Sequence, residues 1–430
     1  MSQFRKQHMS IAWHDIIENE DNTPAINSSL KEKATLVGRL GLMMLSVGAG
    51  AWRVRASMNK AARALNITCT ADIGLLSIEY TCIENGETYT NALSLSNTGV
   101  NTDKLNYLEK FADGFNKKIS RYSVEHFHKI LDKIQDMPGN YTAFKLGLAA
   151  AVACGAFTFL LGGGIVEVIC AFFGAGVGNF IRKKLLEKHI TLFANVAVGV
   201  ASACCVYVLL IKLSEIIWDI SNVHQAGYIC SMLFVIPGFP LITGGIDLAK
   251  LDLRSGLERT TYALLIIIVA TLTGWITFQP SDFEEICLNP ILMFILRLAA
   301  SFCGVYGFSL MFNSTKKMAL TAGIIGMIVN TLRLELIDFT PIPVAAAAFI
   351  GSLCSGLLAS AIKKYVGFPR ITLTVPSIVI MVPGMFMYKG IYYIALNDIQ
   401  TGALWLTKAL LIVVALPLGL IFARILTDNN

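Results

Sequence analysis

The chain has 430 residues, of which 55% are hydrophobic and only 15% are charged, and its mean hydropathy is +0.62. Because a soluble domain carries about 25% charged residues, a chain this long and this apolar cannot cover itself with polar groups in water. The composition excludes a soluble enzyme, a disordered chain and a secreted disulfide scaffold, and it predicts an integral membrane protein.

The charges are concentrated in the N-terminal third of the chain. Residues 1–140 hold 31 of the 64 charged residues, whereas the other 290 residues hold 33. The net charge of +6 divides into +1 for this first part and +5 for the rest, so the surplus belongs to loops beside a membrane and not to a nucleic-acid surface. The polar N-terminus lacks the apolar core of a signal peptide, so we expect the soluble part to stay in the cytoplasm.

The soluble part is predicted to be a polar tail over residues 1–33 and an α+β domain over residues 34–140. The expected elements, in chain order, are a helix over 34–66, strands over 73–83 and 88–95, and helices over 101–118 and 123–135. The helices are predicted from apolar residues at helical spacing. The two strands flank Asn85 and Gly86, and an Asn-Gly pair is a strong signal for a hairpin turn. The predicted order is therefore helix, hairpin, helix, helix.

From residue 141 onward, ten apolar segments approach the roughly 20 residues that a bilayer requires. They cover residues 142–161, 164–181, 191–216, 228–249, 260–279, 288–312, 317–337, 341–362, 371–396 and 402–425. Clusters of Lys and Arg fall in alternate connections, and such loops stay on the cytoplasmic side. They predict a multi-pass protein of a bacterial cytoplasmic membrane with both termini inside.

The ten segments divide into two groups of five, over residues 141–282 and 283–430. The fourth segment of each group contains a Pro-Gly pair, Pro237 with Gly238 and Pro383 with Gly384, and the pairs are 146 residues apart. An odd number of spans per group turns the second group upside down, as in inverted-repeat transporters, whose substrates bind where interrupted helices meet. The alternative is that each pair only kinks its helix. The predicted fold is thus ten transmembrane helices in two inverted repeats of five helices, after a small α+β domain.

Ionisable residues inside spans are costly and indicate functional sites. Arg297 is the most deeply placed, and it could bind a substrate carboxylate or pair with a structural acid. Glu167, just inside the second span, and Asp247, at the inner end of the fourth, are candidate proton carriers. Lys389, in the ninth span, is either interfacial or a second cation for substrate. Thr243 could contact a small zwitterion, although such residues more often hold helices together.

Few side chains in the sequence suit a metal or a histidine relay. The ten cysteines form no CxxC pair, and most lie in apolar runs, where cysteine behaves as a small hydrophobic residue. We expect no metal site and no cofactor. All six histidines fall outside the predicted spans, so coupling to protons would need carboxylates.

The soluble domain has a second interpretation, that of a membrane-tethered hydrolase or sensor. Its nucleophile would be Ser57 or Cys69 and its base His126 or His128. No GxSxG elbow, metal triad or phosphate loop surrounds these residues, and two histidines at i and i+2 do not share a helix face. A gating or interaction module is therefore the expected role.

Short motifs, in their order and spacing, resemble the threonine/serine exporter family over about residues 34–425. In the N-terminal part they are the glycine-rich segment ending at Gly50, then Arg53 and Arg55, and the segment from Asn101 to Leu105. In the membrane part they are Gly164 with Glu167, Pro237 and Gly238 with Asp247, then Asp252, Ser255, Gly256 and Arg259, and finally Pro369, Pro376, Pro383, Gly384 and Tyr388. The resemblance implies a proton-driven exporter of small hydrophilic metabolites, typically threonine and serine. Some relatives, with the halves on separate chains, resemble dicarboxylate exporters.

We therefore expect a secondary active transporter in the lipid bilayer that exports threonine, serine or a similar small molecule by alternating access, coupled to protons. A homodimer is compatible with this expectation, and neither catalysis nor nucleic-acid binding is expected. The expected substrate-binding residues are Pro237, Gly238, Thr243, Arg297, Pro383, Gly384 and Tyr388, and the expected proton-coupling residues are Glu167 and Asp247. The alternative substrate is a dicarboxylate such as succinate, which would need the cations of Arg297 and Lys389.

Overall fold

The computed structural model describes residues 11–17, 23–218, 225–277 and 289–428. The chain forms two structural units. Unit 1 comprises residues 1–139 and the distant segment Ile246–Arg259, and unit 2 comprises Asn140–Gly245 and Thr260–Asn430. The sequence analysis assigns residues 246–259 to the first membrane repeat, whereas in the structure this segment packs with the N-terminal domain.

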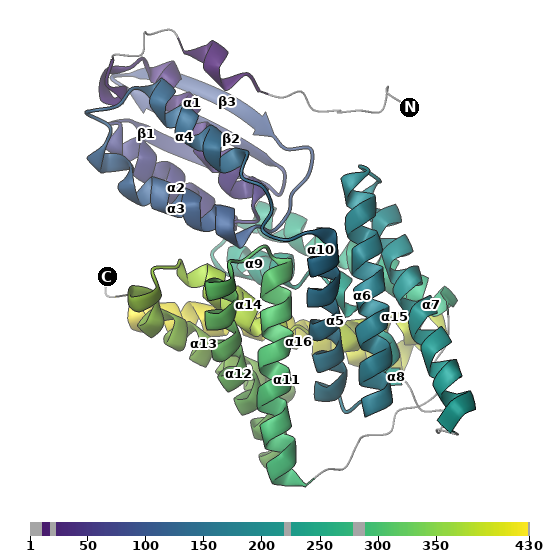
Figure 1. Ribbon diagram of the computed structural model, residues 1–430. Coiled ribbons are helices and arrows are strands. Elements are labelled where there is room, and N and C mark those ends of the chain that lie inside the picture. Colours follow the sequence, from purple (N-terminus) through teal and green to yellow (C-terminus); the bar gives the residue numbers. More distant parts are fainter. Residues whose placement is uncertain (1–10, 18–22, 219–224, 278–288, 429–430) are drawn as a thin grey trace. The chain divides into compact units, whose positions relative to one another are not determined.

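Unit 1 is an α+β domain (Figure 1). Its elements are η1 (Trp13–Ile16), η2 (Ala25–Asn27), α1 (Leu30–Ser46), α2 (Ala51–Ala64), β1 (Thr68–Ile73), β2 (Ser77–Glu84), β3 (Glu87–Ser94), α3 (Thr102–Gly114), η3 (Phe115–Lys117) and α4 (Val124–Gln135). The side chain of Ser29 and that of Glu32 cap the start of α1 reciprocally. Helix α1 thus begins four residues before the predicted domain boundary at residue 34.

The strands form an antiparallel sheet in the order β1-β2-β3. Alternate residues of β2, namely Ile78, Tyr80 and Cys82, are buried on one face, as expected for a sheet covered on one side. Helices α1 and α2 pack against the sheet, and α3 and α4 in turn contact α1 or α2. The core of unit 1 therefore lies between the sheet and helices α1 and α2.

The prediction of one strand over residues 73–83 is wrong, because the sheet has three strands. A turn at residues 74–76 separates β1 from β2, and the Gly74 N–H donates to the Ser77 carbonyl at 2.9 Å. The turn contains Leu75 and Leu76, and because these apolar residues resemble the rest of a strand, the sequence gives no sign of a turn there. The Leu75 N–H donates to the Glu258 carboxylate at 2.5 Å. This partner is distant in the sequence, so no local pattern could reveal it.

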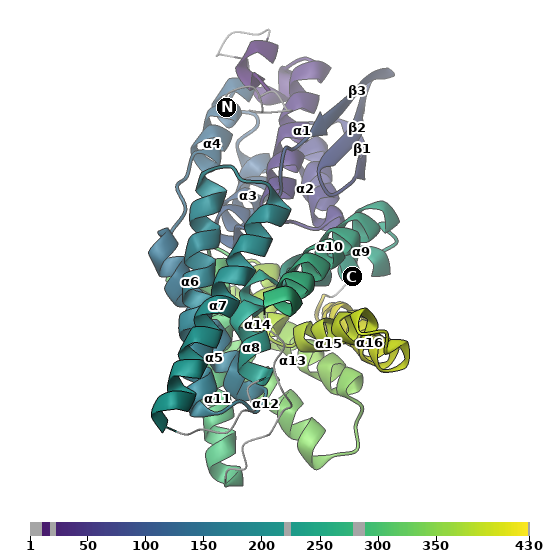
Figure 2. The ribbon, with the colours of Figure 1, turned by 90° about the vertical axis from the view of Figure 1, so that its right-hand side faces the viewer.

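Unit 2 is entirely helical in the part that the structure describes (Figures 1 and 2). Its helices are α5 (Ala143–Leu160), α6 (Ile165–Glu187), α7 (Leu192–Trp218), α8 (Gln225–Met232), η4 (Leu233–Val235), α9 (Gly238–Ala249), α10 (Leu253–Thr277), α11 (Pro290–Met311), α12 (Lys316–Phe339), α13 (Val344–Val366), α14 (Arg370–Val379), α15 (Gly384–Ala395) and α16 (Ile399–Thr427). The end of α9 and the start of α10 belong to unit 1.

Among the described residues, eight helices are long and apolar enough to cross a membrane, and the number rises to ten if each of two bent pairs counts as one span. The bent pairs are the segments Ala226–Val235 with Gly238–Ala249, at 68°, and Arg370–Val379 with Gly384–Ala395, at 49°. The prediction of a multi-pass membrane protein is confirmed. Helices α5–α10 and α11–α16 form two series of six. In each series the break lies between the fourth and fifth helices, that is, between α8 and α9 and between α14 and α15.

Candidate functional site

The two helix breaks have corresponding backbone hydrogen bonds. Gly238 donates its N–H to the Ile236 carbonyl, and Gly384 donates to the Val382 carbonyl, each at 2.8 Å. Three N–H to carbonyl bonds of the first break recur in the second. In the first break they run from Gly238 to Ile236, from Ile236 to Leu233 and from Leu241 to Pro237. In the second they run from Gly384 to Val382, from Val382 to Val379 and from Met387 to Pro383. Proline lacks the N–H that would continue each helix. The breaks predicted from the Pro-Gly pairs are therefore present, and they are structurally equivalent.

The two breaks also pack against each other reciprocally. A Cβ atom added at Gly238 would lie 2.5 Å from Val379 Cγ2, and one added at Gly384 would lie 2.6 Å from Ile236 Cδ1. The second neighbours are Val382 for Gly238 and Leu233 for Gly384. Val379 and Val382 of the second break are equivalent to Leu233 and Ile236 of the first. Each glycine therefore has as neighbours the equivalents of the residues beside the other glycine. A contact across a two-fold axis has this property, and both glycines leave room for side chains of the other break.

A small cavity of about 20 Å³ lies at this contact. It is lined by equivalent residues of the two helix series, Leu233 and Val379, Ile236 and Val382, Gly238 and Gly384, together with Phe157 of α5 and Phe308 of α11. Small-molecule sites usually measure about 300–1,000 Å³, and a cavity of this size holds about one water molecule. A solute could enter only if the two breaks moved apart.

Two polar residues expected near the breaks differ in their remaining hydrogen-bonding capacity. Thr243 donates its hydroxyl to the carbonyls of Phe239 and Pro240 in its own helix. Tyr388 on α15 is 4% exposed, and its hydroxyl has no partner among the described residues. Trp275, whose neighbour Gly274 lies against the Tyr388 ring, has a buried indole N–H that likewise lacks a partner among those residues. Sequence reasoning missed Trp275, because an apolar run gave no signal.

Arg297 pairs with two acids near one end of helices α11 and α12. Its guanidinium lies 3.0 Å from the Glu335 carboxylate and 2.6 Å from that of Asp338. Phe308 at the cavity lies eleven residues farther along α11, which is about 16 Å along the helix axis. Of the two roles that its sequence position leaves open, the geometry favours the structural ion pair.

Replacing Arg297 and Glu335 together with glutamine should retain at least about half of the transport activity that the resemblance implies, because the local net charge is unchanged and a partly exposed ion pair contributes little. The flux is measured as counterflow in proteoliposomes. Arg297→Gln alone, which leaves two carboxylates facing each other, serves as the comparison. A loss of about tenfold or more in the double variant would instead assign Arg297 to the substrate.

Glu167 is buried and joins the starts of two helices. Its carboxylate accepts the N–H of Gly164, before α6, at 2.7 Å and the N–H of Gly227, in the first turn of α8, at 3.2 Å. Carboxylates are favoured at helix N-termini by the unpaired N–H groups and the helix dipole. Through these two bonds Glu167 holds the starts of α6 and α8 together.

Asp247 forms a buried ion pair inside unit 1. One of its oxygens accepts from the Ala51 N–H and from the Ser255 hydroxyl, each at 3.0 Å, and lies 3.3 Å from Arg259 Nε. Arg259 in turn donates to the Ala49 carbonyl at 2.7 Å. Both charged side chains are at most 2% exposed. Since Ala51 begins α2, Asp247 caps this helix from a distant part of the sequence.

Further pairs join the segment Ile246–Arg259 to the rest of unit 1. Arg55 of α2 lies 2.6 Å from Asp252, and Arg254 pairs with Asp72 of β1. The residues that carry the family resemblance in two distant parts of the sequence, among them Gly50, Arg55, Asp247, Asp252, Ser255 and Arg259, thus lie together in one structural unit. The sequence motifs marked these positions but gave no indication that they are in contact.

The candidate hydrolase residues are not assembled into a catalytic site. Among the described residues, Ser57, Cys69, His126 and His128 form no hydrogen bond with one another. His126 stacks on Tyr122 with ring centroids 4.2 Å apart. His128 is fully buried, and burial together with the neighbouring Arg39 lowers its pKa to about 4. It is therefore neutral near pH 7.

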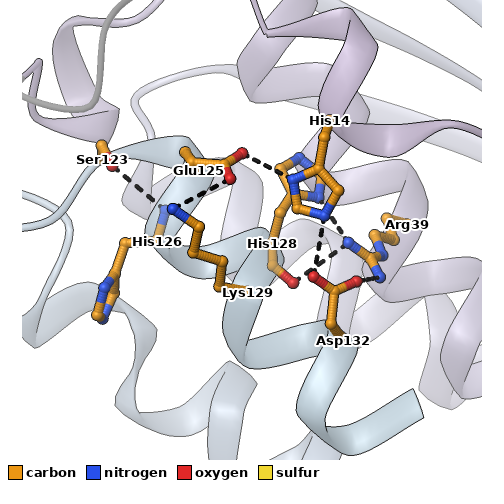
Figure 3. Close-up of polar contacts among 8 residues, drawn as sticks. All are labelled: His14, Arg39, Ser123, Glu125, His126, His128, Lys129 and Asp132. Atoms are coloured by element: carbon orange, nitrogen blue, oxygen red, sulfur yellow. Dashed lines mark hydrogen bonds and ion pairs between the residues drawn. The ribbon is translucent and has the colours of Figure 1, made fainter. Parts of the chain in front are cut away.

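A charged cluster attaches the segment at η1 to helix α4 (Figure 3). His14 lies with Nδ1 2.8 Å from the Glu125 carboxylate and Nε2 2.9 Å from that of Asp132. Arg39 of α1 donates from one terminal nitrogen, Nη2, to Asp132 at 2.5 Å, and its second terminal nitrogen, Nη1, lies 3.0 Å from His128 Nδ1. A neutral imidazole has only one N–H donor, so the arrangement requires the protonated form of His14.

Hydrogen exchange in residues 12–16 should accelerate, beyond its intrinsic pH dependence, as the pH rises from 6 to 9. The hydrogen bond to Glu125 is the main cause that raises the pKa of His14 above 6.5. The stabilisation is therefore complete below pH 6.5 and is lost as the pH rises through the raised value. His14→Gln should remove this dependence, and His126→Gln, which changes a histidine outside the cluster, should retain it.

The same cluster should weaken in acid. Burial acts to raise the pKa of Glu125 and that of Asp132, but hydrogen bonds from His14, Lys129 and Arg39 outweigh it and lower both values. The stability that these two carboxylates contribute is present above their ordinary pKa values of 4.5 and 3.8. It is lost as the pH falls through their lowered pKa values. Exchange that is independent of pH across both ranges would contradict the assignment of a protonated His14.

Comparisons with known proteins agree with these observations. Residues 35–279 match a family described as "Putative threonine/serine exporter", and residues 297–426 match "Threonine/Serine exporter, ThrE". The "Probable succinate transporter subunit YjjP" of Escherichia coli (strain K12) is 25% identical over 242 residues, which are 55% of this chain and 91% of that protein. The protein of the same name from Klebsiella aerogenes is 25% identical over 241 residues, 54% of this chain and 90% of the relative.

No solved structure matches the chain. The first family match alone covers more than half of the 430 residues, and the second covers most of the remainder. The helices long enough to span a membrane agree with a membrane exporter. The chain belongs to the threonine/serine exporter family.

Proposed function

We propose that the chain is a secondary active exporter of threonine, serine or similar small amino acids, and that it works by alternating access. The observation that carries this proposal is the reciprocal contact of two equivalent helix breaks around a small cavity. Transporters built from inverted repeats bind their substrates where such interrupted helices meet. The exchange of contacts between equivalent residues of the two breaks supports two repeats related by a two-fold axis.

In this mechanism the small cavity represents a closed state without room for substrate. Separation of the breaks on one side and then the other would expose the region between Gly238 and Gly384 alternately to the two faces of the membrane. At the starts of α9 and α15 the N–H groups of Gly238 and Gly384 are already bonded, and Pro240 has none. The N–H groups of Phe239 in α9, and of Met385 and Phe386 in α15, remain to favour a substrate carboxylate. The unpartnered hydroxyl of Tyr388 is a donor for a further hydrogen bond, and the apolar walls suit a short side chain.

Proton coupling is assigned to Glu167 rather than to Asp247. Glu167 accepts only backbone N–H bonds in the contacts that the structure describes, and its protonation would release the starts of α6 and α8. Asp247 is instead held by Arg259 and by the start of α2. We place both termini on the cytoplasmic side, because the basic loops of the sequence alternate with neutral or acidic ones.

The test is counterflow in proteoliposomes that contain the purified full chain. Labelled threonine and serine should accumulate when the vesicles are preloaded with the unlabelled amino acid, and an imposed pH gradient should change the rate. Flux no higher than in empty vesicles would reject the proposal. Glu167→Gln should retain exchange while removing the effect of the pH gradient, and loss of both would make the residue structural only.

Export of a dicarboxylate is the second candidate, and the two relatives named as probable succinate transporter subunits favour it. A dicarboxylate needs cations, but Arg297 is already paired with two acids. Lys389 lies 4.9 Å from the centre of the Trp405 ring. Competition decides between the candidates: succinate should leave serine flux unchanged if the substrate is an amino acid and should inhibit it if the site takes dicarboxylates.

A further inference from the structure

Unit 1 contains a large groove along one face of α2. The groove measures about 950 Å³. Its walls are Trp52, Arg55, Ala56, Asn59, Lys60, Arg63 and Ala64 of α2, followed by Asn66, with Ile26 of η2 and Asn116, Ile119 and Ser120 opposite. The α2 residues recur at spacings of three and four, so they form one helix face. The volume is at the upper end of that of small-molecule sites.

Among the residues that the structure describes, the lining is basic and contains no acidic side chain. Arg55 pairs with Asp252 and Lys60 with Asp113, and neither acid lines the groove. Arg63 is exposed and has no hydrogen-bond or ion-pair partner among the described residues. From Arg55 to Arg63 the cations extend over eight residues, which is about 12 Å of helix. Several anionic groups in a row would match this spacing.

The remaining polar residues of the groove can recognise a neutral polar body. Asn59, Asn66, Asn116 and Ser120 have no side-chain hydrogen bond within the described parts of the chain. A carboxamide both donates and accepts, so these residues suit hydroxyl groups and the edge of a heterocycle. Trp52, Ile26 and Ile119 add apolar surface to the walls.

We propose that this groove binds a soluble phosphorylated small molecule of nucleotide size. The cations of α2 bind its phosphoryl groups, with Arg63 as the principal contact because no acid among the described residues pairs with it. The asparagines and Ser120 contact the rest of the ligand. The N-terminal domain is then a ligand-binding module, and this role is independent of which substrate the membrane part carries.

The test uses the full chain in nanodiscs of phosphatidylcholine alone, titrated calorimetrically with ATP and, separately, with inorganic triphosphate. We expect saturable binding of both probes, tighter for ATP. Arg63→Gln should weaken both by about tenfold, because it removes charge-assisted hydrogen bonds. Asn116→Ala should weaken ATP only. Lys117→Gln is the matched control, since this exposed lysine lies near the groove but does not line it, and its effect should stay within about twofold.

Absence of saturable binding by either probe, or equal effects of Arg63→Gln and Lys117→Gln, would overturn the proposal. A second set of nanodiscs containing phosphatidylglycerol identifies the source of the phosphoryl group. ATP should bind equally in both sets. If phosphatidylglycerol displaces ATP from the wild type, the groove belongs to a lipid headgroup and the proposal of a soluble ligand fails. Because binding is measured directly, neither result depends on the outcome of the transport assay.

Discussion

Gly238→Ala is expected to slow threonine counterflow by about tenfold, and the additional substitution Val379→Ala is expected to restore most of it. The added methyl group would lie 2.5 Å from Val379 Cγ2, and valine cannot rotate away easily, because its branched side chain is stiff. Overpacking of this kind costs about 1–3 kcal/mol, which here opposes closure of the two breaks. The double variant removes the obstructing atom.

The equivalent substitution on the other break should have a smaller effect. Gly384→Ala would place its methyl group 2.6 Å from Ile236 Cδ1, which is the end of a longer and more adaptable side chain. Gly155→Ala in α5 is the control, since its nearest neighbour would be at an ordinary 3.4 Å. Normal transport by Gly238→Ala, or a folded double variant that remains slow, would show that the closed contact is not part of the transport cycle.

Asp247→Ala is expected to destabilise unit 1 by about 3–5 kcal/mol, because it leaves the buried Arg259 guanidinium without its counter-ion. The measurement is thermal unfolding followed by labelling of the Cys82 thiol, which is fully buried in the same unit. Asp247→Leu combined with Arg259→Met should recover much of the stability, since an apolar pair needs no charge compensation.

The same experiment separates this structural role from proton coupling. Asp247→Asn should also unfold at a lower temperature, because an amide cannot neutralise Arg259. Asp252→Asn is the matched control on the same segment, and its pair with the partly exposed Arg55 should be worth about 1 kcal/mol or less. If Asp247→Asn were as stable as the wild type and lost only the effect of the pH gradient, Asp247 would be a proton carrier, as its sequence position first suggested.

Several features of the fold could be predicted because their causes are local. A bilayer requires about 20 apolar residues per helix, so hydropathy located each span, although α6 ends at Glu187 rather than 181 and α10 begins at Leu253 rather than 260. Proline inside a helix removes a backbone hydrogen bond, and both breaks predicted from the Pro-Gly pairs are present. The Asn85-Gly86 turn joins β2 to β3 as expected, since this pair favours the hairpin conformation.

Other features depend on partners that are distant in the sequence. The extra strand β1 ends at an apolar turn held by Glu258. Arg297, Asp247 and Glu167 were recognised as unusual, but a charge within a span has the same sequence signal whether it binds substrate, pairs with an acid or caps a helix. Their contacts with Glu335, Arg259 and Gly227, respectively, are the basis on which we propose different roles for them.

The sequence by itself determined that this protein has a charged N-terminal domain and a membrane part of about ten apolar segments with two matched interruptions. The length and hydropathy of a segment, and the effect of a proline on its helix, depend on residues close together in the sequence, so the sequence alone predicts them. Only the tertiary structure decided that the two breaks pack reciprocally and that residues 246–259 belong with the N-terminal domain. Both results depend on side chains that lie far apart in the chain, and their contacts arise only when the helices pack.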